Sequence, residues 1–486
     1  MHRNQIDPKI SVSIVFVAAM FMSIMDTTIV NVALPSLGRQ LGATNTSIDA
    51  VVVSYLVALA VVIPASGWLG DRFGTKLIFL SSLALFVIAS ALCGLAQNFP
   101  MLVAFRALQG LAGGALTPSG TALLFRTFPP EQRVQVSRVL IIPTVIAPAV
   151  GPVLGGFLVD RLSWRWVFYV NVPIGILAFL FGLIYLYEYR EPDTGRFDVV
   201  GFVLAGVGLA LVMYALSEGP AYGWANTVIL GSLIVGLVLL VVFVFVELRI
   251  SEPMVNLRLF QNGLFRTANI VTFFSGAGFL GVLFVVPLFL QEARGADALT
   301  SGLTTFPEAL GVVISTQIVA RLYPRTGPRR LSAIGLTGVA VMIALLSLIG
   351  LDTNLWLVRG LMFLIGFGMA YSFLPMQTAA FATISRQATG QASTLYNAER
   401  QIGSAIGVAL LSTVLSIVGP VFRNTRGAIV PNANAYHAAF IAAAVLCLIA
   451  ATCSLAIHDK DAAATMVIPT KHEHAPQEAA SPEVSL

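Results

Sequence analysis

The chain has 486 residues, of which 57% are hydrophobic and 10% are charged, and its formal net charge at pH 7 is +5. A soluble protein carries roughly 25% charged residues, so this composition excludes a soluble enzyme, while the long apolar runs exclude an outer-membrane barrel, whose strands alternate apolar and polar residues. The basic excess is typical of the loops of a membrane protein, so we expect a lipid bilayer as partner and no nucleic acid.

Fourteen apolar runs follow one another along the chain. A transmembrane helix needs about 20 apolar residues, and each span must be helical because the bilayer core holds no water to satisfy an open backbone. The sequence therefore predicts an all-α polytopic membrane protein. The expected spans are 10–34, 48–68, 77–96, 101–125, 139–159, 166–187, 199–216, 227–246, 268–290, 301–322, 331–351, 355–380, 392–418 and 438–457.

Basic residues are distributed unevenly between the connecting segments. With the N-terminus inside, nineteen Lys and Arg residues fall in cytoplasmic segments and six in external ones. This asymmetry follows the positive-inside rule, so we expect a multi-pass protein of the inner, cytoplasmic membrane with both termini in the cytoplasm. The polar tail 458–486 has the composition of a disordered segment.

Two parts of the chain repeat each other. Arg106 and Arg359 lie in similar surroundings 253 residues apart, and the same offset aligns the loop 70–76 with the loop 323–329. Two halves related by an axis along the membrane normal are typical of transporters that rock between two states of access. The expected organisation is a six-helix bundle over 1–196, two inserted helices and a linker over 197–265, a second six-helix bundle over 266–457 and the tail 458–486.

Several motifs resemble the signatures of one transporter family. They read DTTIVNVALP from Asp26, GWLGDRFGTK from Gly67, RALQGLAGG from Arg106 and APAVGPVLGG from Ala147. They resemble the drug:proton antiporters of the major facilitator superfamily, and SWRWVFYVNVPIG from Ser163 resembles the branch with fourteen spans. The resemblance implies the major facilitator fold, with two six-helix bundles plus two inserted helices, and an exchange of small molecules for protons.

The loop after the second span is the expected gate. The resemblance implies that Asp71 and Arg72 bridge helix ends when the cytoplasmic side is closed, and Gly74 permits a tight turn. Thr75 departs from the family pattern, which usually has Arg at this position. The alternative is that the basic residues of this loop only set the topology.

Small residues form a stripe on the span 139–159. Positions 147, 151 and 155 recur every fourth residue and share one helix face, which lets helix backbones approach closely. The resemblance implies an antiporter helix that seals against a neighbour and limits leak, whereas plain helix packing is the alternative. The residues of this motif are Ala147, Gly151, Pro152, Gly155 and Gly156.

Charged residues within the spans are functional candidates, because each costs about 2.5–3.5 kcal/mol on insertion scales. Asp26 and Arg106 lie eight and five residues from the outer ends of their spans. Because these two residues lie at similar depth, we expect Asp26 to carry the coupled proton and Arg106 to adjust its protonation. A static ion pair is the alternative. Glu308 is the next candidate for proton coupling. The residues expected near a substrate cavity are Gln109, Arg359, Glu399 and Arg400.

These patterns predict a proton-coupled antiporter that exports hydrophobic or amphipathic drug-like or antibiotic compounds by alternating access. The chain contains no G-x-x-x-x-G-K-[ST] run, so we expect the proton-motive force as energy source, no cofactor, no metal and no enzymatic activity. Two alternatives stay open: an exporter of an endogenous metabolite, lipid or siderophore, and a membrane receptor or scaffold that transports nothing. The sequence leaves the oligomeric state open.

Overall fold

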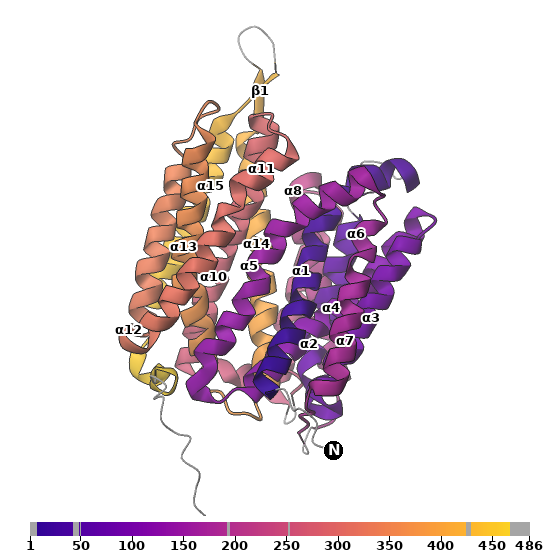
Figure 1. Ribbon diagram of the computed structural model, residues 1–486, viewed down its shortest axis with the longest axis vertical. Helices are drawn as coiled ribbons and strands as arrows, with labels where there is room; N and C mark the ends of the chain where they lie inside the picture. The colour runs from indigo at the N-terminus through magenta and orange to yellow at the C-terminus, as the bar shows by residue number, and fades with distance from the viewer. Residues whose placement is uncertain are drawn as a thin grey trace, which may run out of the picture.

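The structure is a computed structural model, and it describes residues 7–41, 48, 50–191, 195–250, 253–423 and 429–466. Helices dominate the described chain (Figure 1). The first are α1 (Pro8–Leu41), α2 (Ala50–Phe73), α3 (Thr75–Leu95), α4 (Phe99–Thr127), α5 (Arg133–Arg161), α6 (Trp166–Tyr169) and α7 (Asn171–Tyr185). The others are α8 (Val199–Tyr222), α9 (Thr227–Arg249), α10 (Gly263–Leu288), α11 (Ala298–Thr305), α12 (Pro307–Leu346), α13 (Leu355–Ala380), α14 (Thr389–Val418) and α15 (Ala433–Ser454).

Short elements join these helices. They are the 3₁₀ turns η1 (Pro130–Gln132), η2 (Leu257–Gln261) and η4 (Asp459–Thr465), the π-helical turn η3 (Phe289–Ala293), and the strands β1 (Val421–Arg423) and β2 (Ile429–Pro431). The two strands form an antiparallel hairpin, which projects from the end of the molecule opposite the N-terminus (Figure 1). The end that carries the N-terminus is called the lower end below, and the end that carries the hairpin is the upper end.

Polar residues at the loop ends set the starts of several helices. The side chains of Asn98, Asn262 and Asn354 each accept a hydrogen bond from a backbone N–H in the first turn of α4, α10 and α13. An N-cap of this kind satisfies a donor that has no partner within the helix. These helices therefore begin where the sequence changes from a capping residue to an apolar run.

The long helices form two bundles that stand side by side (Figure 1). In the first, α1 packs against α5 and α7, and α4 packs against α2 and α3. In the second, α10 packs against α14 and α15, and α12 packs against α13. The predicted all-α polytopic fold, with two bundles and an inserted helix pair, is confirmed.

The inserted pair α8 and α9 touches both bundles through α8. This helix packs against α2 of the first bundle and α14 of the second, and α9 packs on α8. The indole Nε1 of Trp224 donates to Thr413 Oγ1 of α14 at 2.7 Å. The helix α9 is predominantly apolar and many of its apolar side chains are exposed, as expected for a helix that faces lipid.

The number of membrane-length helices is lower than the fourteen expected spans. Among the described residues, twelve helices are long and apolar enough to cross a membrane, or thirteen if the bent pair Arg133–Pro148 and Val153–Val159 is one span. One part of the difference comes from Leu299–Leu346, which is counted as one helix although it covers two of the expected spans. Its 48 residues would measure about 72 Å as one straight helix. Gly327 interrupts it with φ 77° and ψ 166°, at the loop that the sequence placed between two spans.

Part of the tail is ordered, so the prediction of disorder is wrong for residues 458–466. The 3₁₀ turn η4 packs at the lower end of α12, where the hydroxyls of Tyr323 and Thr465 lie 2.8 Å apart. The carboxylate of Asp459 accepts a hydrogen bond from the backbone N–H of Arg329 at 3.0 Å. Composition did not reveal these partners, because they come from a distant helix; residues 467–486 lie outside the described residues.

Candidate functional site

Asp26 and Arg106 form an ion pair in the interior of the first bundle. The Asp26 side chain is fully buried, and that of Arg106 is 1% exposed. The guanidinium Nη1 donates to Asp26 Oδ2 at 2.5 Å, while Nε donates to the backbone oxygen of Val51 at 3.2 Å. The guanidinium also lies over the ring of Tyr55, 4.3 Å from the ring centroid. A buried pair of charges persists only where further partners compensate for lost water.

Amide side chains supply those further partners. Asp26 Oδ1 accepts hydrogen bonds from Gln109 Nε2 at 3.0 Å and from Asn171 Nδ2 at 2.8 Å. Arg106 Nη1 also donates to Gln109 Oε1 at 2.7 Å. Gln109 was expected near the substrate cavity but completes this network instead. Asn171 was not predicted as a site residue, although an amide inside the apolar run of VNVPIG was the available signal.

Glycines after Arg106 bring α4 close enough to α2 for these contacts. A Cβ on Gly110 would collide with the carbonyl oxygen of Tyr55, and one on Gly114 would collide with that of Leu59. Small residues at a spacing of four permit this approach. The run that follows Arg106 in the sequence therefore positions its guanidinium over Tyr55.

Asp71 occupies the lower end of α2 and pairs with an arginine that the sequence analysis did not select. Arg126 Nη2 of α4 donates to Asp71 Oδ1 at 2.6 Å, and its Nη1 donates to Thr75 Oγ1 at 2.5 Å. Asp71 also contacts the first turn of α14, since a Cβ on Gly390 would collide with its carboxylate. The N-terminus of a helix favours a nearby negative charge, so Asp71 holds α2, α4 and α14 together.

The other two predicted gate residues lie differently. Arg72 is exposed. Gly74 is buried with φ 112°, and any Cβ there would collide with the carboxylate of Glu188. Glu188 accepts hydrogen bonds from the backbone N–H groups of Lys76 and Leu77 at 2.9 and 3.1 Å, at the start of α3. Gly74 is thus required by both its backbone conformation and this close carboxylate.

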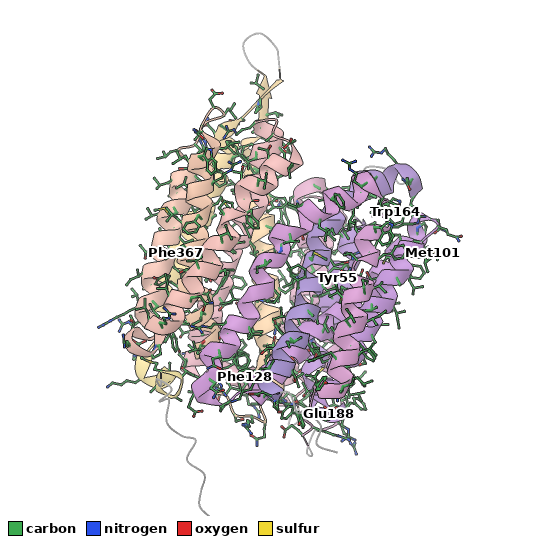
Figure 2. All side chains as sticks on the ribbon, viewed as in Figure 1. Tyr55, Met101, Phe128, Trp164, Glu188 and Phe367 are labelled. Atoms are coloured by element: carbon green, nitrogen blue, oxygen red, sulfur yellow. The ribbon has the colours of Figure 1, made fainter. Side chains whose placement is uncertain are left out.

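Direct contacts join the two bundles toward the lower end, where Phe128 and Glu188 also lie (Figure 2). The rings of Phe125 and Phe381 stack at a centroid distance of 4.0 Å. Ser393 Oγ of α14 donates to the backbone oxygen of Pro118 at 2.7 Å. Two hydroxyl pairs cross between the bundles as well, namely Ser66 with Thr394 and Ser137 with Thr378. These contacts close the lower end between the bundles.

A cavity lies between the bundles, with about 960 Å³ of empty space including its open mouth. Its wall draws on α1, α4 and α5 of the first bundle and on α10, α12, α13 and α14 of the second. More than half of the lining residues are apolar, while Glu308 and Arg400 bring charge to the wall. A concave, mostly apolar pocket with few polar groups is the usual form of a site for a small molecule.

The charged residues of the second bundle do not form a counterpart of the Asp26 pair. The carboxyl oxygen Oε1 of Glu308 is buried and has no hydrogen-bond partner among the described residues. Arg359 lies over the ring of Trp356, 4.6 Å from its centroid. Neither carboxyl oxygen of Glu399 has a hydrogen-bond partner among the described residues. Of the four residues expected near the cavity, Arg400 lines it, whereas Gln109, Arg359 and Glu399 do not.

Two glycines of the antiporter motif on α5 pack against α1. A Cβ on Gly151 would collide with the side chain of Thr28, and one on Gly155 would collide with Ile29. Ala147 is fully buried, whereas Gly156 has no atom near its missing Cβ. The side chain of Pro152 lies outside the described residues. The helix bends by 43° between its segments 133–148 and 153–159.

The sequence matches the family model described as Major Facilitator Superfamily over residues 16–408. It is similar to the multidrug resistance protein B homolog of Mycobacterium tuberculosis, with 34% identity over 408 residues, 83% of this chain and 75% of that protein. It is also similar to multidrug resistance protein 3 of Bacillus subtilis, with 34% identity over 395 residues, 81% of this chain and 77% of that protein.

Among solved structures, the fold is similar to the crystal structure of the human organic anion transporter MFSD10 (TETRAN). The TM-score is 0.68 with 16% sequence identity, and the alignment covers 92% of this chain and 99% of that chain. At this identity the likeness concerns the fold alone.

Proposed function

Because this chain belongs to the major facilitator superfamily, we propose that it exports small drug-like molecules in exchange for protons by alternating access. The observation that carries this proposal is the cavity between two bundles whose lower ends are in contact. A site enclosed from one side, between halves that pack as separate bundles, suits a mechanism in which the halves rock about a bound molecule.

The cargo is proposed to be hydrophobic or amphipathic. Phenylalanine, leucine and isoleucine side chains supply much of the cavity wall. Glu308 also lies on it, and its buried carboxyl oxygen Oε1 has no hydrogen-bond partner among the described residues. Burying an unpaired polar group is costly, so a cargo that brings a positive charge or a donor to Glu308 gains affinity. The names of the two multidrug resistance relatives support drug-like molecules as the cargo.

The coupled proton is proposed to bind at Asp26. Its carboxylate has fixed donors in Gln109 and Asn171 and a fixed counter-charge in Arg106. A rocking motion that separates the carboxylate from the guanidinium favours the protonated acid, because a neighbouring positive charge favours the ionised form. Glu308 is the second proposed proton carrier, since it meets the cargo in the cavity.

The proposed topology has fourteen crossings, with both termini in the cytoplasm of a cell whose inner membrane holds the protein. The break at Gly327 supports two crossings within Leu299–Leu346, and the bent helix α5 supports one more. The distribution of basic residues supports cytoplasmic lower ends. On this topology the ion pair Asp71–Arg126 belongs to the cytoplasmic gate.

The experiment that tests the function is reconstitution in liposomes with an imposed pH gradient. We expect an amphipathic cation such as ethidium to accumulate against its gradient and to be accompanied by proton release. Collapse of the gradient by a protonophore should abolish accumulation. Ethidium movement that is independent of the pH gradient would exclude proton coupling. If no drug-like compound moves, an endogenous cargo or a protein that transports nothing would be favoured.

A further inference from the structure

Arg400 of α14 brings a positive charge to the wall of the cavity between the bundles. A guanidinium stays charged in proteins, and none of the ion pairs found in the described part of the chain includes this residue. Its Nη2 donates to Asn397 Oδ1 at 3.5 Å, which is long for a hydrogen bond. A charge with so little compensation, beside a mostly apolar cavity, favours an anionic group next to it.

The neighbouring acid does not form a hydrogen bond with this guanidinium. Glu399 precedes Arg400 in the sequence, and adjacent side chains on a helix do not face each other. Both carboxyl oxygens of Glu399 are buried without a hydrogen-bond partner among the described residues, and this residue does not line the cavity. The acid and the base therefore serve different sides of α14, and the base is the one that borders the cavity.

One face of α14 is polar where it borders the cavity. Tyr396, Asn397, Arg400 and Ser404 all line the cavity, and their spacing of three and four residues places them on one side of the helix. The hydroxyl of Ser404 donates to the backbone oxygen of Arg400 at 2.7 Å, and Asn397 Nδ2 donates to the backbone oxygen of Ser393 at 2.8 Å. Because these two neighbours already bond to the helix backbone, the guanidinium is the main donor that this face offers to a ligand.

The same cavity also carries an acid. Glu308 of α12 lines it, and its buried Oε1 has no hydrogen-bond partner among the described residues. No ion pair joins Glu308 to Arg400 in the part of the chain that the structure describes, so the acid and the base are both available to a bound molecule. When Glu308 is ionised, a purely cationic cargo is attracted by Glu308 but repelled by Arg400, and a purely anionic cargo experiences the reverse. A cargo with both signs of charge meets a complementary partner at each end.

We propose that Arg400 binds a carboxylate of the cargo, and that the preferred cargo is a zwitterionic amphipathic molecule whose positive group lies toward Glu308. A carboxylate accepts paired hydrogen bonds from a guanidinium, which fixes the orientation of the bound molecule. The apolar body of the cargo packs on apolar wall residues such as Phe279 and Leu280. This inference rests on the proposed export of small molecules from the cavity, and it narrows the cargo within that class.

The test compares three dyes with the same three-ring core. Tetramethylrhodamine carries a positive charge and a carboxylate, its methyl ester keeps only the positive charge, and fluorescein keeps the carboxylate without the positive charge. Binding to the full chain purified in detergent is measured by fluorescence anisotropy at neutral pH, with protein-free detergent as the blank. We expect the wild type to bind tetramethylrhodamine about tenfold more tightly than either of the other dyes, as one charged hydrogen-bonded contact implies.

Variants at two arginines assign the preference to its residue. Arg400→Gln should weaken tetramethylrhodamine binding about tenfold and should leave the methyl ester bound as tightly as before or more tightly, because a repelling charge is gone. Arg400→Lys keeps the charge and should keep part of the preference for the carboxylate. Arg359→Gln is the matched control, since Arg359 lies in α13 but does not line the cavity, and it should bind all three dyes as the wild type does.

Equal affinity of the wild type for tetramethylrhodamine and its methyl ester would overturn this inference without any need for a variant. A preference that survives in Arg400→Gln, or that is lost equally in Arg359→Gln, would overturn it as well. These binding measurements require no transport, whereas accumulation of ethidium in liposomes tests export itself. A carboxylate preference in a protein that fails to accumulate ethidium would therefore support the site and contradict the proposed function, and ethidium export without the preference would do the opposite.

Discussion

Asp26 owes its position to three donors from two other helices of the first bundle. Arg106 and Gln109 approach it from α4, and Asn171 approaches it from α7. Because all of these side chains are buried, removing the carboxylate leaves the guanidinium of Arg106 without a counter-charge. A substitution at position 26 therefore affects stability as well as coupling, and an experiment has to separate the two.

We expect Asp26→Asn to abolish uphill export and substrate-induced proton release, since the amide cannot carry the proton. The lone guanidinium should also lower the free energy of unfolding by about 3–5 kcal/mol. The double variant Asp26→Asn/Arg106→Gln removes both charges and should recover most of that stability without recovering coupling. Thermal unfolding in detergent measures the change in stability, and proton release in liposomes measures coupling. If the double variant still shows pH-driven accumulation, another residue carries the proton, and Glu308 is the first candidate.

At the lower end, Asp71 and Arg72 are neighbours in sequence with different surroundings. Asp71 is buried between Arg126 and the first turn of α14, whereas Arg72 is exposed. Asp71 contacts helices of both bundles, so we assign the gating role proposed for this loop to Asp71.

Asp71→Asn should slow transport about tenfold, which corresponds to about 1.4 kcal/mol in the barrier, because the charged contacts that close the gate become neutral. Glu191 Oε1 lies 3.8 Å from Arg126 Nη2 and keeps a counter-charge beside the guanidinium, so protein abundance and drug binding should stay close to wild type. Arg72→Gln is the matched control and should transport normally. Initial rates in liposomes and equilibrium binding of ethidium provide the measurements; equal slowing by both variants would count against a gate at Asp71.

At the scale of single elements, glycines let α5 pack closely against α1. Its glycines at positions 151 and 155 face α1 so closely that no Cβ fits without a shift, whereas Gly156 faces open space. Gly403 and Gly407 of α14 meet Phe273 and Ala277 of α10 in the same way. Each bundle therefore has one glycine-bearing helix that presses on its own first helix.

Gly151→Ala should destabilise the protein by about 1–3 kcal/mol through overpacking against Thr28, and should raise proton leak through the empty transporter. Gly156→Ala places the same methyl group in open space and improves helix propensity, so it should leave both quantities unchanged or slightly improved. Thermal unfolding and passive proton flux measure the effects. If the two variants show the same stability and the same proton leak, the glycine stripe of α5 is plain helix packing and not a seal against leak.

The second loop repeats the first in structure as well as in sequence. Gly327 has a φ of 77°, and a Cβ there would collide with Asp459, just as one on Gly74 would collide with Glu188. In both bundles an acid beyond the last helix meets the backbone N–H groups that start the helix after the loop. The positive-φ glycine and its carboxylate are thus one structural unit used twice.

The whole molecule is organised by this repetition. The pairs α1 with α5 and α1 with α7 correspond to the pairs α10 with α14 and α10 with α15. The inserted helix α8 lies outside the repetition and packs on α2 and α14, one helix from each bundle. Any rocking of the bundles must therefore move α8 against at least one of these neighbours.

The proposed fourteen crossings predict the side of the membrane on which each loop is labelled. In a variant without native cysteines, Arg330→Cys should react with a membrane-impermeant maleimide only from the cytoplasm, and Asp352→Cys only from outside. Both positions are exposed, unlike buried Gly327, where a side chain would also collide with Asp459. Labelling of both cysteines from the same side would show that Leu331–Leu351 does not cross the membrane.

The sequence was sufficient for features that depend on local pattern. Apolar runs predicted the helical spans, the 253-residue offset predicted the second loop, and depth along the helices predicted that Asp26 and Arg106 would lie at the same level. These inferences succeed because helix length and side-chain depth follow from a fixed rise of about 1.5 Å per residue. Spacing alone also identified the glycines of α5 that face a neighbour.

Only the tertiary structure decided which side chains meet. Asn171 joins Asp26, Arg126 joins Asp71, and Glu188 meets Gly74 across 55 to 145 residues of sequence. Glu308 and Arg359 are an acid and a base within the spans of the second bundle, as Asp26 and Arg106 are in the first, yet no ion pair joins them among the described residues. Periodicity fixes the height of a residue along its own helix, whereas the rotation and tilt of neighbouring helices are set by packing over the whole bundle.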